Sequence, residues 1–176
     1  ALAAQAAPPI KVMLLDGESG GPYHAWQETT PYLKRMLDDT HLFQVDIVTA
    51  PPKDGDFSAF HPEWSKYKVI VSNYDVPDER WSDALKASFE EYIQKGGGLV
   101  SVHAADNAFP NWKAYNLMIG VGGWRGRNEK SGPHFYYENG KLVADPSPGS
   151  AGSHGARLAY KIVNQVTDHP ITKGLP

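Results

Sequence analysis

The residues best placed to do chemistry in this chain follow three short hydrophobic runs. Asp16 follows the first run, Asn73 and Tyr74 follow a later one, and His103 follows a third, with Asp106 three residues further on. If these runs are parallel strands, their carboxyl ends meet at one sheet edge, where open α/β sheets bind their ligands. The pattern therefore predicts a single site at that edge.

His103 is the strongest candidate. It follows the run from Leu99 to Val102 and precedes small residues, which is typical of a tight turn that holds a side chain above a strand. An imidazole there can act as a general acid or base, bind a metal, or hydrogen-bond to a sugar hydroxyl. The pattern is equally compatible with a structural histidine that bonds to neighbouring backbone.

Three further candidates have weaker support. Asp106 could orient or charge-pair with His103 in catalysis, or it could cap a helix. His24 lies in the long polar loop after the first run and could fold over the same edge, although loop histidines are usually only solvated. His154, between serine and glycine, could close on bound substrate from a flexible loop, but loops commonly expose such residues.

The remaining polar candidates, Asp16, Asn73 and Tyr74, could bind substrate. Each also has a structural interpretation, because Asp16 could cap the loop that follows it and the other two could be turn residues.

A metal site is another hypothesis for the histidines. His24, His103 and His154 with a carboxylate could bind zinc or another divalent metal. The chain lacks a compact ligand spacing such as His-Glu-x-x-His, so the cofactor is left open. It also has no cysteine, which excludes disulfides, zinc–thiolate sites and cysteine nucleophiles.

The elements that must position these residues are predicted by hydrophobic periodicity. The alternation of strands and helices favours a parallel sheet with crossover connections. Asn139-Gly140 predicts a hairpin, because both turn positions require positive φ. The predicted strands are 10–15, 43–47, 69–71, 99–102 and 158–166. The first predicted helix is capped by Thr29 and Thr30, has Pro31 in its first turn, and has an apolar face of Leu33, Met36 and Leu37. The second helix runs from Asp78 to Gln94, and a short third helix lies near 112–119.

Composition narrows the function further. The net charge of −3 gives no basic surface for nucleic acid, and no run approaches the ~18 apolar residues of a membrane helix. Five Trp and nine Tyr are a generous number for this length. Aromatic residues usually fill cores, but their rings also stack on sugars, which slightly favours a carbohydrate ligand. The oligomeric state is left open, and a homo-oligomer is compatible with the sequence.

The two ends differ from the rest. Residues 1–9 are Ala-rich and end in Pro8-Pro9, which we interpret as a disordered leader or signal remnant, favouring a periplasmic or exported protein over a cytoplasmic one. Residues 10–176 are expected to form one α/β domain. The chain stops soon after Asp168-His169-Pro170, and we expect a truncation at its C-terminal end.

Three ordered motifs resemble the ThuA-like, or trehalose-utilisation, family. They are Val12–Gly17 with His24–Pro31, then Gly96–Asp106, then Asp168–Pro176. The resemblance implies a flavodoxin-like, three-layer fold related to class I glutamine amidotransferases, with a mostly parallel sheet and an added β-hairpin. His103 takes the place of the nucleophilic cysteine of those enzymes, so thiolate-dependent glutamine hydrolysis is excluded.

The resemblance also implies a substrate class, since the family is associated with bacterial use of trehalose and related disaccharides, including routes through 3-keto sugars. Our leading hypothesis is a sugar-processing enzyme that acts on a disaccharide, glycoside or keto-sugar. One alternative is a non-catalytic carbohydrate-binding or sensing module, with Tyr74, Trp112 or Trp124 stacking on a sugar ring. Another is a metal-dependent hydrolase.

Overall fold

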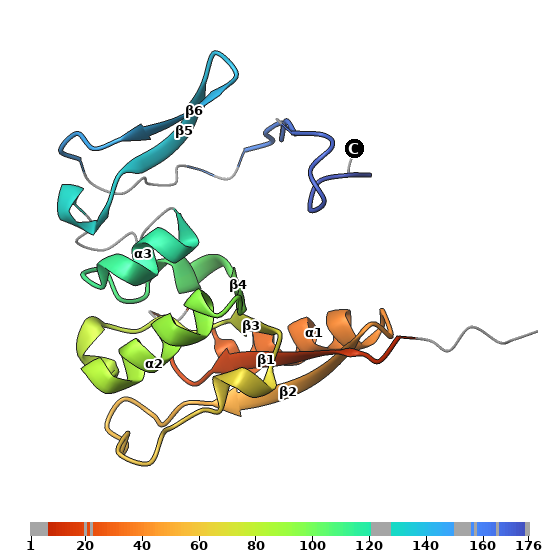
Figure 1. The fold of residues 1–176 in the computed structure, drawn as a ribbon, viewed down its shortest axis with the longest axis vertical. Coiled ribbons are helices and arrows are strands. Elements are labelled where there is room, and N and C mark those ends of the chain that lie inside the picture. Colours follow the sequence, from red (N-terminus) through yellow and green to blue (C-terminus); the bar gives the residue numbers. More distant parts are fainter. Residues whose placement is uncertain are drawn as a thin grey trace, which may run out of the picture.

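The computed structural model describes residues 7–19, 21, 23–120, 128–149, 156, 158–164 and 166–174. A parallel sheet of strand order β2-β1-β3-β4 lies at its centre (Figure 1). Its strands are β1 (Ile10–Asp16), β2 (Phe43–Thr49), β3 (Val69–Ser72) and β4 (Gly98–Ser101). The predicted α/β class and its four parallel strands are confirmed, with ends shifted by one or two residues.

Side-chain alternation along β1 creates the three layers. Val12 and Leu14 pack on one face of the sheet with Leu33 and Leu37 of helix α1 (Trp26–Asp38). Met13 and Leu15 point to the other face, into a larger cluster that includes helix α2 (Asp83–Gln94) and helix α3 (Lys113–Ile119). Because neighbouring strand residues point to opposite faces, one strand supplies the core of both layers.

The larger cluster is built mainly of aromatic rings. Trp81 contacts Phe89 and Phe109 at ring-centre separations of 5.8 and 4.9 Å, and Phe109 contacts Trp112 edge-on at 5.2 Å. Edge-on and tilted contacts are the preferred arrangements of aromatic pairs. Three of the five Trp and three of the nine Tyr are buried in this core, whereas five of the other tyrosines are exposed.

Helix α2 begins later than predicted. Asp78–Arg80 forms a separate 3₁₀ turn, and Ser82 is the N-cap, where its hydroxyl accepts a hydrogen bond from the Leu85 amide. The glycine run ends the helix as expected. A Cβ at Gly97 would lie 2.2 Å from the Tyr92 ring, so this glycine is needed for close packing.

Helix α1 begins earlier than predicted, so the cap assigned to Thr29 and Thr30 was wrong. The helix starts at Trp26, whose amide donates to the Ser19 hydroxyl at 3.2 Å, and Pro31 lies inside the helix. The apolar face was also partly wrong, because Met36 is 68% exposed.

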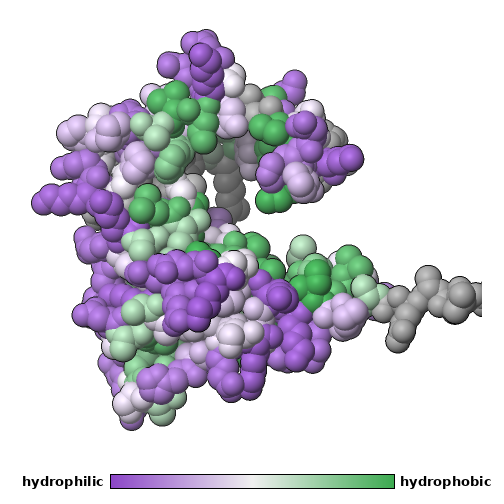
Figure 2. Space-filling model, in the orientation of Figure 1, coloured by the Kyte–Doolittle hydropathy of each residue, from purple (hydrophilic) through white to green (hydrophobic). Residues whose placement is uncertain are grey.

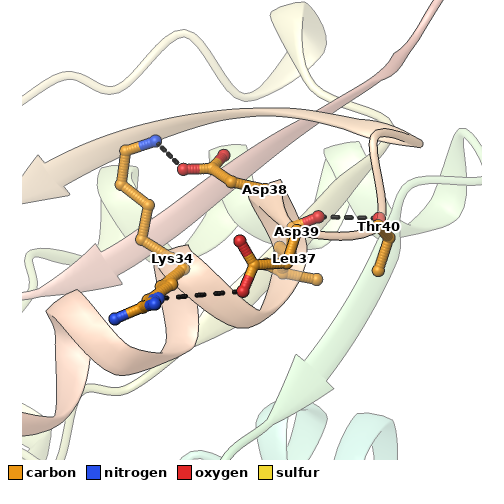
Figure 3. Close-up of polar contacts among 6 residues, drawn as sticks. Lys34, Leu37, Asp38, Asp39 and Thr40 are labelled. Carbon is orange, nitrogen blue, oxygen red and sulfur yellow. Dashed lines mark hydrogen bonds and ion pairs between the residues drawn. The ribbon is translucent and has the colours of Figure 1, made fainter.

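The last turn of α1 is held by polar contacts (Figure 3). Lys34 pairs with Asp38 at 2.7 Å, and the Thr40 hydroxyl donates to the Leu37 carbonyl at 2.7 Å. The hydroxyl satisfies a carbonyl that the helix leaves unpaired at its end. The exposed ion pair contributes little, about 0.3–0.5 kcal/mol.

The hairpin predicted around Asn139-Gly140 is confirmed as β5 (His134–Glu138) and β6 (Lys141–Asp145), with φ of 50° and 74° at the two turn residues. It stands apart from the parallel sheet (Figure 1), and Figure 2 shows hydrophobic side chains on the part of the surface it forms. The exposed set is Phe135, Tyr136, Tyr137 and Leu142.

The strand predicted at 158–166 was wrong for its described residues, which have no regular secondary structure. The remaining 3₁₀ turns are Trp64–Lys66, His103–Asn107 and Glu129–Ser131. No helix in the described part of the chain is long and apolar enough to cross a bilayer.

Two phenylalanine truncations test whether the hairpin lies outside the main core. Phe89 is 2% exposed and Phe135 is 43% exposed. We expect Phe89→Ala to lower the free energy of unfolding by about 3–5 kcal/mol and Phe135→Ala by less than about 1 kcal/mol. Urea unfolding of both variants checks this, and equal losses would show that the hairpin belongs to the main core.

Candidate functional site

A pocket of about 830 Å³ lies at the carboxyl ends of the parallel strands. This volume is within the ~300–1,000 Å³ typical of small-molecule sites. Three predicted site residues meet in it, namely His24 from the loop after β1, Asn73 from the turn after β3 and His103 from the turn after β4. The remaining lining consists of Tyr23, Thr29, Tyr32, Leu33, Val102 and Ala104.

His103 has an unusual backbone conformation. Its φ is 44°, in the left-handed region, where it opens the 3₁₀ turn directly after the sheet. The preceding residue is still tied to the sheet, because the Val102 amide donates to the Ser72 carbonyl at 2.9 Å. A non-glycine residue in this region is uncommon and costs about 1–3 kcal/mol. Such outliers cluster at functional sites, and this one leaves His103 exposed.

His24 lies directly against His103. The two imidazole ring centres are 4.8 Å apart, and the ring planes are tilted by 48°. The residues come from different loops, 79 positions apart in sequence, so the fold alone brings them together. The expectation that the long loop after the first strand returns over the sheet edge is confirmed for His24.

An ion pair holds Glu18, near the start of the loop that carries His24. The guanidinium of Arg80 donates to both carboxylate oxygens of Glu18, at 2.7 and 2.9 Å, and also to the Lys53 carbonyl at 2.9 Å. The paired side chains are only 11% and 19% exposed. Bidentate, charge-assisted bonds of this type are among the strongest in proteins. Sequence reasoning missed this pair because 62 positions separate its members.

Asn73 is held by helix α1. Its Nδ2 donates to the hydroxyls of Thr29 and Thr30, at 2.8 and 3.1 Å, and its amide donates to the Leu15 carbonyl at 2.9 Å. The two threonines that the sequence indicated as helix caps therefore orient the amide group of a pocket residue.

Asp16 lies beneath this network. It is 1% exposed and does not line the pocket. Burial raises its pKa, while the hydroxyls of Thr49 and Thr30 partly oppose the rise. Its Oδ1 accepts no hydrogen bond within the described residues. Asp16 therefore supports the site from below, and in this conformation it cannot contact substrate.

Tyr74 and Trp112 are core residues. Tyr74 is 1% exposed and stacks on Trp81 at 6.1 Å, and burial strongly raises its pKa. Trp112 is 8% exposed. Neither ring has the free face that stacking on a sugar requires. Trp124 and His154 lie outside the described residues.

Asp106 lies on the same turn as His103 but does not line the pocket. Its charge adds to the effect of burial on Tyr115, whose pKa is raised to about 12. The Tyr115 hydroxyl donates to the Ala105 carbonyl at 2.9 Å, so this tyrosine anchors the turn from below.

Two pocket residues were missed by sequence reasoning. Tyr23 is 91% exposed and Tyr32 is 71% exposed, and both line the pocket beside the histidines. Tyr23 adjoins His24. Tyr32 directly precedes Leu33, which packs on the core, so Tyr32 lies on a different side of the helix from Leu33. An exposed tyrosine beside a candidate histidine was the available signal. Within the described ranges, no group of three histidine, aspartate or glutamate side chains is placed to bind a metal.

The fold and pocket together define an α/β protein with a pocket at the strand carboxyl ends. The family model for ThuA, described as trehalose utilisation, matches residues 11–176. The chain belongs to this family, which confirms the resemblance in its motifs.

One solved structure supports the same family, and a second is more distant. A ThuA-like protein of Parabacteroides merdae ATCC 43184 is 41% identical with a TM-score of 0.85, and the match covers 96% of this chain and 59% of that one. A ThuA-like protein of Bacteroides uniformis ATCC 8492 is 23% identical with a TM-score of 0.48, covering 78% and 50%. The chain thus spans less than two thirds of either structure. A search of curated proteins gives no match.

The raised pKa of Asp16 predicts a pH-dependent stability. The Asp16 carboxyl binds a proton more tightly in the folded protein than in the unfolded chain. Its ionisation therefore costs no folding stability below the unfolded pKa near 3.8, and this cost grows as the pH rises through the folded pKa. We expect the stability of Asp16→Asn relative to wild type to increase from pH 4 to pH 7. Urea unfolding at both pH values measures this, with exposed Asp54→Asn as control. A flat or falling difference would contradict it.

Proposed function

We propose that this chain is a sugar-processing enzyme that acts on an oxidised disaccharide, a keto-sugar, by proton transfer at a carbon next to the carbonyl. The observation that carries the proposal is the pair of half-buried His24 and exposed His103 in the pocket at the strand ends, with ring centres 4.8 Å apart. Imidazole is the side chain most often used to take up or give a proton near neutral pH.

The pocket chemistry favours a keto-sugar over an unmodified glycoside. Most glycosidases use two carboxylates on opposite sides of the scissile bond. The described lining of this pocket contains no aspartate or glutamate. A carbonyl acidifies the neighbouring C–H bond, so a histidine can remove that proton without the oxocarbenium-like transition state that the carboxylates serve.

The remaining lining suits a second sugar ring. Tyr23 and Tyr32 offer exposed aromatic faces beside the histidines, and Asn73 and Thr29 offer polar groups for hydroxyls. Sugar-binding pockets combine such apolar faces with a few fixed polar groups. Membership of the trehalose-utilisation family supports a disaccharide as the ligand. Export from the cytoplasm and homo-oligomerisation stay predictions.

His103→Asn tests the catalytic role with little disturbance of the backbone, because asparagine tolerates the left-handed conformation better than alanine. We expect turnover of 3-keto-trehalose to fall by about 10²–10⁴-fold, with little change in melting temperature. His41→Asn is the matched control, since His41 is exposed, also has positive φ (57°) and lies outside the pocket. Wild-type turnover in His103→Asn would refute the proposal.

A carbohydrate-binding module is the second candidate, favoured by the two exposed tyrosines. Under either function, Tyr32→Ala should weaken trehalose binding by roughly two- to tenfold, the value of one aromatic contact. Tyr160 is 84% exposed and lies outside the pocket, so Tyr160→Ala should leave trehalose binding unchanged. Calorimetry measures the affinities, and equal values for both variants would place the sugar elsewhere. Recovery of all keto-sugar unchanged after long incubation with wild type would favour the binding module.

A further inference from the structure

The side chain of Asn73 is held in one orientation at the pocket. Its backbone amide donates to the Leu15 carbonyl at 2.9 Å, which ties the residue to strand β1. Its Nδ2 donates to the hydroxyls of Thr29 and Thr30 on helix α1, at 2.8 and 3.1 Å. A side-chain amide nitrogen carries two protons, so these two bonds use both of them.

Each threonine hydroxyl accepts from Asn73 because its own proton is used elsewhere. The Thr29 hydroxyl donates to the Ala25 carbonyl at 3.2 Å. The Thr30 hydroxyl bonds to the buried Asp16 carboxyl and lowers its pKa, which is the effect of a hydroxyl that donates to a carboxylate. Turning the amide over would set its oxygen against two hydroxyls with no proton to give, and both bonds would be lost. The network therefore determines which way the Asn73 amide faces.

The Asn73 Oδ1 is the polar atom of this side chain that is left for a ligand. Asn73 lines the pocket together with His24 and His103, and no described group donates to its Oδ1. An amide oxygen only accepts hydrogen bonds, so a ligand group placed against it must be a donor. The described pocket lining also contains no lysine or arginine, which favours a neutral ligand over a phosphorylated one.

We propose that Asn73 determines specificity by accepting a hydrogen bond from one hydroxyl of a neutral sugar, and that Thr30 is the positioning residue that fixes the Asn73 amide for this role. The inference rests on the proposed function for the identity of the ligand. A carbonyl oxygen cannot donate, so the oxidised carbon of a keto-sugar cannot lie against Asn73. An unoxidised hydroxyl lies there instead, which helps to set how the sugar is oriented toward the two histidines.

Calorimetry with trehalose and its difluorinated analogues tests the acceptor. Each analogue carries fluorine at the same position of both rings, because trehalose is symmetric and a singly substituted molecule could bind the other way round. Fluorine is similar in size to a hydroxyl but cannot donate. We expect wild type to bind at least one analogue roughly three- to tenfold more weakly than trehalose, the value of one neutral hydrogen bond. In Asn73→Ala this difference should fall below about twofold.

A pair of variants at Thr30 tests the positioning role. Thr30 is 2% exposed; valine keeps its shape without the hydroxyl, and serine keeps the hydroxyl. We expect Thr30→Val to lose the discrimination between trehalose and that analogue, and Thr30→Ser to retain it. A purely structural defect would weaken the binding of both sugars alike. The control is Thr40→Val, since Thr40 is exposed and lies outside the pocket, and it should discriminate as wild type does.

The outcomes decide both parts of the proposal. Equal binding of trehalose and every analogue by wild type overturns the acceptor, and so does a difference that persists in Asn73→Ala. Discrimination retained in Thr30→Val overturns the positioning role. If Asn73→Ala fails to fold, Thr30→Val carries the comparison, and the difference in wild type is required in either case.

Binding and turnover together separate this inference from the proposed function. Discrimination that depends on Asn73, without turnover of any keto-sugar, would keep the acceptor and refute the enzyme. Turnover of 3-keto-trehalose by Asn73→Ala with the kcat and KM of wild type would refute the acceptor and leave the enzyme. Absence of trehalose binding by wild type overturns the acceptor whatever the turnover.

Discussion

Strand β1 is hydrogen-bonded on both sides, to β2 and to β3, and its residues from Val12 to Asp16 are at most 2% exposed. A strand so enclosed cannot satisfy its backbone with water, so it requires both neighbours in register. Its alternating side chains supply both cores, and its carboxyl end determines where the loops meet. The pocket exists at that edge because the parallel arrangement brings all four strand ends there.

Local patterns predicted much of this fold, and the failures have physical causes. Continuous apolar runs identified the buried strands, and Asn139-Gly140 identified the hairpin. Thr29-Thr30-Pro31 has the local chemistry of a helix start, but Ser19 accepts the Trp26 amide and allows the helix to begin four residues before Thr30. The run 158–166 has alternating apolar residues but no partner strand in the described residues.

For the site, the strand-end rule located His103 and Asn73 without any tertiary information. It could not separate residues that face the pocket from those that face the core, and so it included Asp16 and Tyr74, which the structure buries. Glu18, at the start of the loop that carries His24, is held by Arg80, a long-range contact that no local pattern contains. The exposed tyrosines were missed because only the tertiary structure shows that they line the pocket.

The left-handed turn at His103 also limits how this site can evolve. β-Branched side chains are strongly disfavoured in that conformation, whereas histidine, asparagine and aspartate tolerate it. The sheet that imposes the turn is stabilised elsewhere, by the buried strand and the aromatic cluster. Mutation can therefore replace the side chain at position 103 with one of a few residue types while the rest of the fold stays intact. Single replacements at this position thus give the fold a route to new chemistry.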